Sequence, residues 1–210
     1  ERREEYGLTW KNWKASLFCI LVFLVIYFGR AVVSYVIEGE ADMVPEILAN
    51  PMALGYLIAM PINFVISFAP FFGEEYGWRY YLQPILQKRF GMRCGVLLLG
   101  VVWGLWHIFL DFFYYTTPDR GLIMTVSQII GCVGLGIFFA WAYLKTENIW
   151  VPTILHFLNN NLILLVANEY STEVLENQAV TWEMIPAAFL LNGVLYGVFI
   201  LAKEFRKKEG

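Results

Sequence analysis

Adjacent carboxylates and two histidines are the residues of this sequence best placed for chemistry, because all of them lie at or inside long apolar runs. Residues 74–79 read Glu-Glu-Tyr-Gly-Trp-Arg, and His107 and His156 are the only histidines in the chain. Asn160 follows His156 by four positions. Glutamate and histidine are common general acids and bases, and an ionisable side chain inside an apolar span marks a functional site by default. The pattern therefore predicts acid–base chemistry in an apolar setting.

The spacing of these residues assigns them to helix faces. Positions four apart share one face of a helix, so Glu75 can pair with Arg79, and His156 and Asn160 can point into one cavity. Adjacent residues point about 100° apart on a helix, so Glu74 and Glu75 cannot do the same job. We expect one glutamate to pair with Arg79 while the other faces a reactive site, a separation that lets two carboxylates take different roles.

The composition shows what kind of protein must position these residues. The chain has 210 residues, of which 59% are hydrophobic and 16% charged, with a mean hydropathy of +0.56. Globular proteins are about one quarter charged. The six apolar runs are 15–37, 52–73, 94–115, 121–144, 149–167 and 184–202. We therefore predict an all-α, multi-pass integral membrane protein with about six transmembrane helices in a single membrane-embedded domain, 1–210. The pI near 5.5 leaves no basic footprint for a nucleic-acid partner.

Charge is distributed unevenly between the two sides of the predicted bundle. The loops 38–50 and 168–183 carry acidic residues and no Lys or Arg. Thirteen of the fifteen basic residues fall on the other side, namely Arg2, Arg3, Lys11, Lys14, Arg79, Lys88, Arg89, Arg93, Lys145, Lys203, Arg206, Lys207 and Lys208. The positive-inside rule then places both termini in the cytoplasm, and we expect a bacterial cell membrane.

Two stretches on this basic side mix cationic and aromatic residues. Segments 6–14 and 79–90 are predicted to be amphipathic helices on the cytoplasmic face of the bilayer. Simple span-flanking anchors are the alternative for segment 6–14.

Straight helices would place the candidate site residues at different depths, since Glu74 lies near the end of its apolar run and His107 lies well inside the next one. We expect Pro61 and Pro70 to bend the second span, so that Glu74 is carried into the membrane.

The three motifs together resemble a known family. In chain order they are E-E-x-x-x-R at 74–79, W-x-x-x-H at 103–107 and H-x-x-x-N at 156–160. This order resembles the CPBP family of CAAX-processing and bacteriocin-processing membrane proteases, also called the Abi family, with the Rce1-type prenyl-protein endopeptidases as relatives. The resemblance covers about 55–167, and Trp103 stands where the family often has Phe. Six spans are fewer than the eight of Rce1-type enzymes, which weakens the case for prenylated substrates.

The resemblance implies an intramembrane endopeptidase whose partners are the lipid bilayer and a peptide or membrane-protein substrate. Carried over residue by residue, Glu74 is the general base that acts on a water together with His107. His156 and Asn160 stabilise the oxyanion. Glu75 and Arg79 hold the first motif.

The cofactor remains open on the residues alone. Two histidines and a glutamate form a legitimate zinc set, here Glu74, His107 and His156. The family resemblance favours hydrolysis without a metal or other cofactor.

Other polar residues and other functions are compatible with the same sequence. Asp111 lies one turn beyond His107, where it can orient the imidazole by accepting a hydrogen bond from it or lie at the outer interface. Arg30 lies inside the first span and has no assigned role. Intramembrane Glu and His also build the relays of proton-coupled transporters, although no internal repeat typical of transporters is present. A non-catalytic bacteriocin-immunity or regulatory membrane protein is the third alternative.

Overall fold

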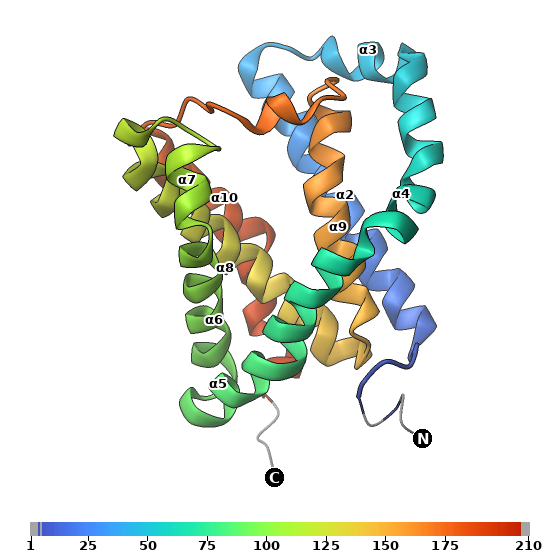
Figure 1. The fold of residues 1–210 in the computed structure, drawn as a ribbon, viewed down its shortest axis with the longest axis vertical. Coiled ribbons are helices and arrows are strands. Elements are labelled where there is room, and N and C mark those ends of the chain that lie inside the picture. Colours follow the sequence, from blue (N-terminus) through green and yellow to red (C-terminus); the bar gives the residue numbers. More distant parts are fainter. Residues whose placement is uncertain (1–3, 5, 207–210) are drawn as a thin grey trace.

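The computed structural model describes residue 4 and residues 6–206, and these residues form a bundle of helices without a strand (Figure 1). The α-helices are α2 (Trp13–Glu38), α3 (Met43–Ala49), α4 (Pro51–Glu75), α5 (Gln83–Phe90), α6 (Met92–Trp106), α7 (Ile108–Phe113), α8 (Gly121–Thr146), α9 (Trp150–Val166) and α10 (Met184–Leu195). A π-helix, η1 (Tyr76–Leu82), joins α4 to α5. Short 3₁₀ segments are η2 (Pro118–Arg120), η3 (Thr172–Leu175), η4 (Gly197–Leu201) and η5 (Lys203–Arg206).

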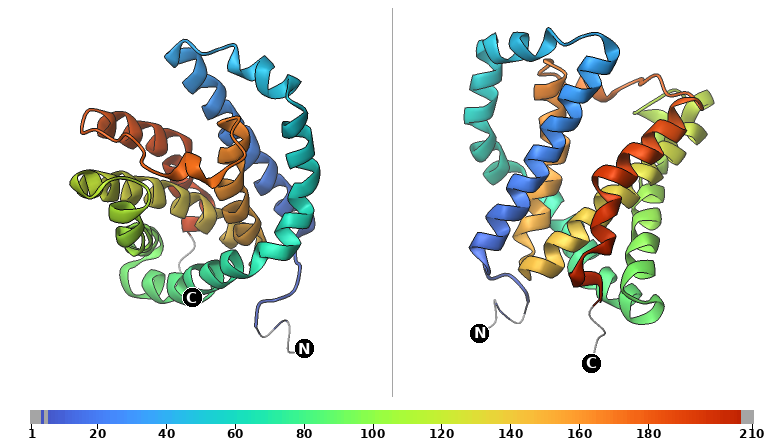
Figure 2. Two further views of the ribbon diagram at one scale, coloured as in Figure 1. Left: turned by 45° about the horizontal axis from the view of Figure 1, so that its top comes forward. Right: turned by 180° about the vertical axis from the view of Figure 1, so that it is seen from behind.

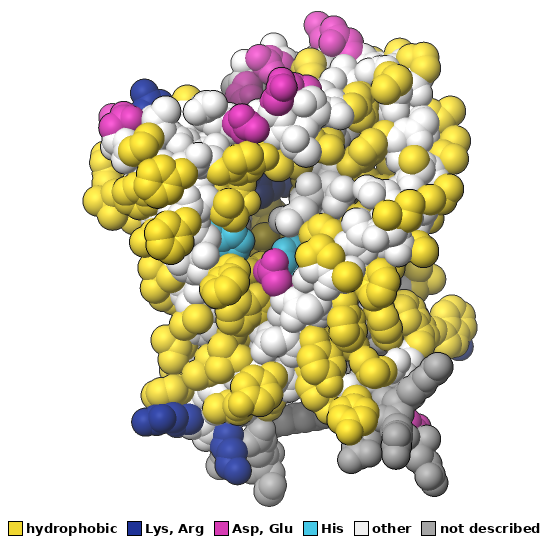
Figure 3. All heavy atoms as spheres, viewed as in Figure 1, with side chains coloured by type: hydrophobic (Ala, Val, Ile, Leu, Met, Phe, Trp, Pro, Cys, Tyr) yellow, Lys and Arg dark blue, Asp and Glu magenta, His cyan; other side chains and the backbone are white. Residues whose placement is uncertain are grey.

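The helices have the lengths and surfaces of an integral membrane protein. Within the described residues, four helical segments are long and apolar enough to cross a bilayer: Trp13–Glu38, Pro51–Phe90, Met92–Phe113 and Pro118–Thr146. The helices α9 and α10 are shorter but also apolar. Large apolar side chains cover the outside of the bundle (Figure 3), among them Ile66 at 78% and Phe109 at 77% exposure. The all-α membrane bundle predicted from the six apolar runs is confirmed.

The two ends of the bundle carry opposite charge. Acidic side chains gather at the end that carries α3, and basic side chains lie at the other end (Figures 1 and 3). The start of α2 and the 3₁₀ segment η5 both lie at this basic end (Figure 2). Arg2, Arg3, Lys207 and Lys208, which contributed to the predicted asymmetry, lie outside the described residues. The assignment of the basic end to the cytoplasm stays a prediction.

The second apolar run continues far beyond the span predicted for it. The helical segments α4, η1 and α5 form one run of 40 residues, Pro51–Phe90. The run bends within α4 and then crosses the bundle obliquely (Figures 1 and 2). Pro61 and Pro70 lie inside α4, and proline bends a helix because it removes a backbone hydrogen bond. Glu74 therefore lies in the interior of a bent helix, as the depth argument requires.

Two sequence predictions need correction. Residues 6–12 form turns and coil instead of the amphipathic helix predicted over 6–14, and α2 begins at Trp13. Left-handed backbone at Gly7 and Asn12 is incompatible with a continuous helix there. Arg79 was counted as a surface cation, but its side chain is fully buried. Its helical neighbours Gln83 and Gln87 are also buried, because this face of η1 and α5 packs inward.

Helix α8 is the centre of the bundle and packs against α2, α6, α7, α9 and α10. Its closest neighbour, α6, approaches through two glycines spaced four apart. A Cβ atom on Gly100 would lie 2.6 Å from Cα of Val133, and one on Gly104 would lie 2.6 Å from Cα of Ile129. Small residues at this spacing let membrane helices pack backbone to backbone. This packing fixes the position of Trp103 and His107 on α6.

Candidate active site

His107 lies at the break between α6 and α7. Its backbone has φ −85° and ψ 0°, so it ends one helix and precedes the next. Its ring nitrogen Nδ1 lies 2.8 Å from the Trp103 carbonyl oxygen. A carbonyl only accepts, so Nδ1 carries the proton that is donated. In the neutral ring, Nε2 is then the free acceptor.

Glu75, Arg79 and His156 form a buried ionic cluster, which we call the hub. Arg79 Nε donates to Glu75 Oε2 over 2.8 Å, and His156 Nδ1 donates to Glu75 Oε1 over 3.0 Å. Glu75 and Arg79 are fully buried, and His156 is 3% exposed. Both carboxylate oxygens of Glu75 are thus occupied. The i,i+4 pair expected from the spacing is present, and it also holds His156, which lies 81 positions away in the sequence.

Aromatic rings and a backbone carbonyl enclose the hub. The Arg79 guanidinium lies 5.2 Å from the Trp103 ring and 5.6 Å from the Phe139 ring. The His156 ring meets Phe71 and Trp103 edge to face at 5.3 Å each. Arg79 also donates to the Gly136 carbonyl of α8. Four helical segments, α4 with η1, α6, α8 and α9, therefore meet around one ion pair, and cation–π contact strengthens in such a dry setting.

Glu74 points in another direction from its neighbour. Its Oε2 atom is buried and has no hydrogen-bond partner among the described residues. Its carboxylate interacts electrostatically with His107, Tyr115 and Cys132, three residues that line a common cavity. The two glutamates thus differ: both oxygens of Glu75 are hydrogen-bonded in the hub, whereas Glu74 Oε2 has no hydrogen-bond partner among the described residues. Glu74 is not itself one of the residues that line the cavity, and its part in a reactive site stays a prediction.

The three consecutive asparagines of α9 make different contacts. Asn159 Nδ2 donates to Asn160 Oδ1 over 3.1 Å, which leaves the Asn160 amide nitrogen free to donate. Asn161 instead accepts from Asn63 of α4 and so connects two helices. The Asn160 side chain is exposed and lines the cavity.

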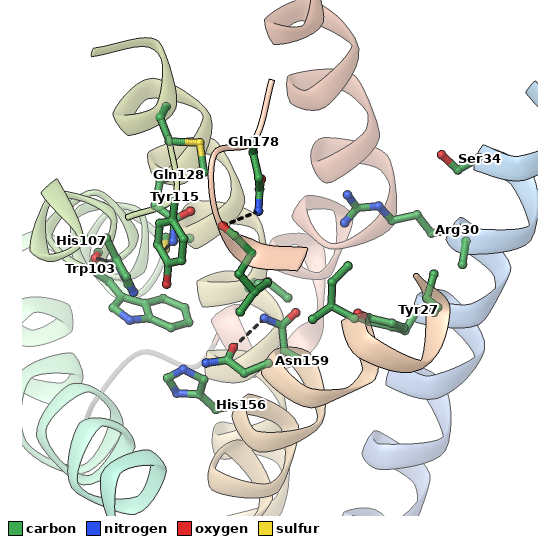
Figure 4. A pocket seen from close by; sticks show the side chains of 18 residues that line it. Tyr27, Arg30, Ser34, Trp103, His107, Tyr115, Gln128, His156, Asn159 and Gln178 are labelled. Atoms are coloured by element: carbon green, nitrogen blue, oxygen red, sulfur yellow. Dashed lines mark hydrogen bonds between the residues drawn. The ribbon is translucent and has the colours of Figure 1, made fainter. Parts of the chain in front are cut away.

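A cavity of about 420 Å³ unites most of these residues (Figure 4). Its wall includes His107, His156 and Asn160, which come from α6, α9 and the break that precedes α7. The opposite wall is formed by α2 and by the loop that follows α9 (Figure 4). Figure 3 shows both histidines within one hollow of the surface, with an acidic side chain beside them.

Asp111 does not orient His107. It is fully buried within the bundle and forms no hydrogen bond with His107 among the described residues. Its placement at the outer interface stays a prediction. The Trp103 carbonyl occupies His107 Nδ1 instead. Sequence reasoning missed this backbone contact, although the W-x-x-x-H spacing contains it, since the two residues are one helical turn apart.

The candidate zinc ligands do not form a metal-binding arrangement. Within the described part of the chain, no three His, Cys, Asp or Glu side chains converge as metal ligands do. The Glu75–His156 contact nevertheless resembles the carboxylate contact that orients a metal-binding imidazole in other proteins. A metal would take Nε2 of His156 and of His107, which are the ring atoms not bonded to protein.

The sequence was compared with known protein families. Residues 56–162 match the family model described as type II CAAX prenyl endopeptidase Rce1-like. The match covers about half of the chain and contains all three motifs. The chain belongs to the Rce1-like family.

One curated relative extends this finding. The protein named "CAAX prenyl protease 2" of Methanococcus maripaludis is 29% identical over 137 residues, which is 63% of this chain and 49% of the relative. The chain therefore spans about half the length of this relative. No solved structure matches the chain.

The Rce1-like segment and the cavity do not coincide completely. The residues expected to do chemistry, from Glu74 to Asn160, lie inside the matched segment. Arg30, Ser34 and Gln178 line the same cavity but lie outside that segment. Sequence reasoning singled out Arg30 as a charge inside a span but could not connect it to the site, because α2 carries none of the three motifs. The bacteriocin-processing side of the resemblance stays a prediction.

Proposed function

We propose that this chain is an intramembrane endopeptidase that hydrolyses a peptide bond with a water activated by Glu74. One observation carries the proposal: Glu75 is fully committed to Arg79 and His156, whereas Glu74 Oε2 has no hydrogen-bond partner among the described residues and the Glu74 carboxylate interacts electrostatically with His107. A general base must reach its proton through an unoccupied oxygen, and in this motif only Glu74 meets that requirement.

The first step uses the cavity side of the site. A water bound between Glu74 and His107 transfers a proton to the Glu74 carboxylate while its oxygen attacks the carbonyl carbon of the scissile bond. His107 Nε2 accepts a hydrogen bond from the same water, because Nδ1 is held by the Trp103 carbonyl. Positioned bases of this kind contribute about 10²–10⁴-fold to a hydrolysis rate.

The second step uses the α9 side. As the tetrahedral intermediate forms, negative charge develops on the former carbonyl oxygen. The Asn160 amide nitrogen, which forms no hydrogen bond among the described residues, can donate to it. Nε2 of His156 can donate to the same oxygen when the ring carries a proton on both nitrogens, because Nδ1 is already bonded to Glu75. The proton held by Glu74 then passes to the leaving amine as the C–N bond breaks. Removal of one such donor costs about 10²–10³ in kcat.

The hub supports these steps without taking part in them. Glu75 binds His156 and Arg79 at once, so a side chain of α9 is positioned by the helix that carries Glu74. The mechanism needs no metal. A chelator added at constant pH tests this point. If it abolishes cleavage and added zinc restores it, Glu74 is a metal ligand or a base that acts on a metal-bound water, and the proposed metal-free role is wrong.

Cleavage by reconstituted protein tests the function. The name of the relative supplies the probe: a farnesylated peptide ending in Cys-Val-Ile-Met, since a terminal Met is typical of farnesylated C-a-a-X sequences. We expect the wild-type protein to cleave this peptide and Glu74→Gln to lose cleavage with an unchanged melting temperature. Full cleavage by Glu74→Gln would contradict the proposed base. If the wild type cleaves neither this peptide nor its unprenylated form, a transporter or a non-catalytic factor becomes the better account.

A further inference from the structure

Arg30 is a charged side chain in an otherwise apolar helix. It lies eight residues before the end of α2, which corresponds to about 12 Å along the helix axis. It is the only Lys or Arg among the residues that line the cavity. Its guanidinium points from α2 into the cavity toward Gln178 (Figure 4). A basic side chain is also visible in the hollow that holds both histidines (Figure 3).

No acidic group neutralises Arg30. Among the described residues it forms no ion pair and no hydrogen bond with another side chain. Ser34, which lines the same cavity, donates to Glu38 over 2.8 Å. The groups that interact electrostatically with Arg30 are the phenols of Tyr27 and Tyr196. A guanidinium within an apolar span is costly unless a partner compensates it.

Arg30 shares its cavity with the residues proposed for catalysis. His107 and His156 lie on one side of the cavity and Arg30 lies on the other (Figure 4), and Asn160 also lines it. The cavity is therefore polarised, with hydrolytic groups on one side and an uncompensated cation on the other. At about 420 Å³ it is within the size range of small-ligand pockets.

We infer that Arg30 binds the C-terminal carboxylate of the peptide substrate, an inference that rests on the proposed endopeptidase function. An arginine fork matches the planar geometry of a carboxylate with two parallel hydrogen bonds. A peptide that places its carboxylate on Arg30 and its scissile bond at His156 must be cut close to its C-terminus.

This placement makes Arg30 a specificity-determining residue. A substrate with a C-terminal amide would leave the guanidinium without its anion, whereas the hydrolytic groups would be unaffected. Hydrogen bonds between charged groups correspond to about 10- to 100-fold in an equilibrium constant. The free acid should therefore bind about 10- to 100-fold more tightly than the amide.

Binding to the Glu74→Gln protein in detergent separates this inference from catalysis. The probes are fluorescent farnesylated peptides ending in Cys-Val-Ile-Met, one with a free C-terminal carboxylate and one with a C-terminal amide. We expect the acid to bind about 10- to 100-fold more tightly, and the additional change Arg30→Gln to abolish this preference without weakening binding of the amide. Arg30→Lys should restore part of the preference, since it keeps the charge but loses the fork. Arg93→Gln, which removes an exposed cation at the basic end, is the matched control and should retain the preference.

Three results would overturn the inference. They are equal binding of acid and amide, weakening of both probes by Arg30→Gln, and no binding of either probe. A fourth result would show that Arg30 binds a lipid headgroup instead of the peptide carboxylate. In that case phosphatidylglycerol raises the melting temperature only when Arg30 is present, and the acid and the amide bind equally. Failure of the proposed endopeptidase function gives a different result. The wild-type protein then binds the acid, Arg30→Gln weakens that binding, and the wild-type protein does not cleave the peptide.

Discussion

Adjacent glutamates, one in the hub and one that interacts with His107, have opposite surroundings. Glu75 is fully buried and bonded through both oxygens to Arg79 and His156. Glu74 Oε2 has no hydrogen-bond partner among the described residues, and its carboxylate interacts electrostatically with His107. Two neighbouring positions on one helix thus hold a structural carboxylate and the one proposed for chemistry. The comparison teaches that the first motif serves two purposes, and that the rotation of about 100° between neighbouring residues keeps them apart.

The largest effect on the hub is expected from Arg79→Met. This change leaves the Glu75 carboxylate buried without its cation, and breaking a buried pair costs about 3–5 kcal/mol. We expect a large fall in the melting temperature of detergent-solubilised protein and loss of cleavage with it. Arg79→Lys, which keeps the charge but loses the contacts of the fork, should fall between this variant and wild type. A melting temperature unchanged in Arg79→Met would mean that the hub does not stabilise the fold.

The corresponding test of the cavity wall is Asn160→Ala. Its free amide nitrogen is proposed to bind the oxyanion, so kcat should fall about 10²–10³-fold while the melting temperature stays near that of wild type, because the side chain is exposed. Asn159→Ala is the matched control on the same helix. Equal losses in the two variants would show that the asparagine pair acts through local structure instead of through the oxyanion.

A smaller effect is expected where the two regions are joined. A methyl group on Gly104 would lie 2.6 Å from the α8 backbone at Ile129. Gly104→Ala should therefore displace α6, which carries Trp103 and His107, at a cost of about 1–3 kcal/mol. Gly131→Ala adds a methyl group to open space on α8 and should leave both stability and cleavage unchanged. If Gly104→Ala lowers kcat by a larger factor than it lowers the fraction of folded protein, the position of α6 affects cleavage directly and not only through stability.

Much of this architecture could be predicted from the sequence, because bilayer burial imposes a simple rule. Apolar runs long enough to span a membrane locate the helices, and i,i+4 spacing is enough to pair Glu75 with Arg79. The bend of the second span also followed from Pro61 and Pro70, while the depth of Glu74 in the membrane stays a prediction. These features depend on local sequence and on the nature of the solvent.

The rest depends on contacts between distant segments. The bond between His156 and Glu75 joins residues 81 positions apart, and no local pattern encodes it. The sequence groups Arg79 with the basic residues that flank the spans, but the structure buries its side chain. Helix packing, and not charge, decides which face of a helix turns inward. The break at His107 arises from a side chain that competes for a backbone carbonyl, and the position of Arg30 opposite the motifs arises from how α2 packs in the bundle.

The most direct test of the account compares Glu74→Gln with Glu75→Gln in the same two measurements, peptide cleavage and melting temperature. Both changes remove one negative charge and keep the shape of the side chain. We predict that Glu74→Gln abolishes cleavage at an unchanged melting temperature, and that Glu75→Gln lowers the melting temperature markedly because Arg79 loses its partner. Cleavage that survives in Glu74→Gln, together with a stable Glu75→Gln protein that cannot cleave, would contradict the account and exchange the two roles.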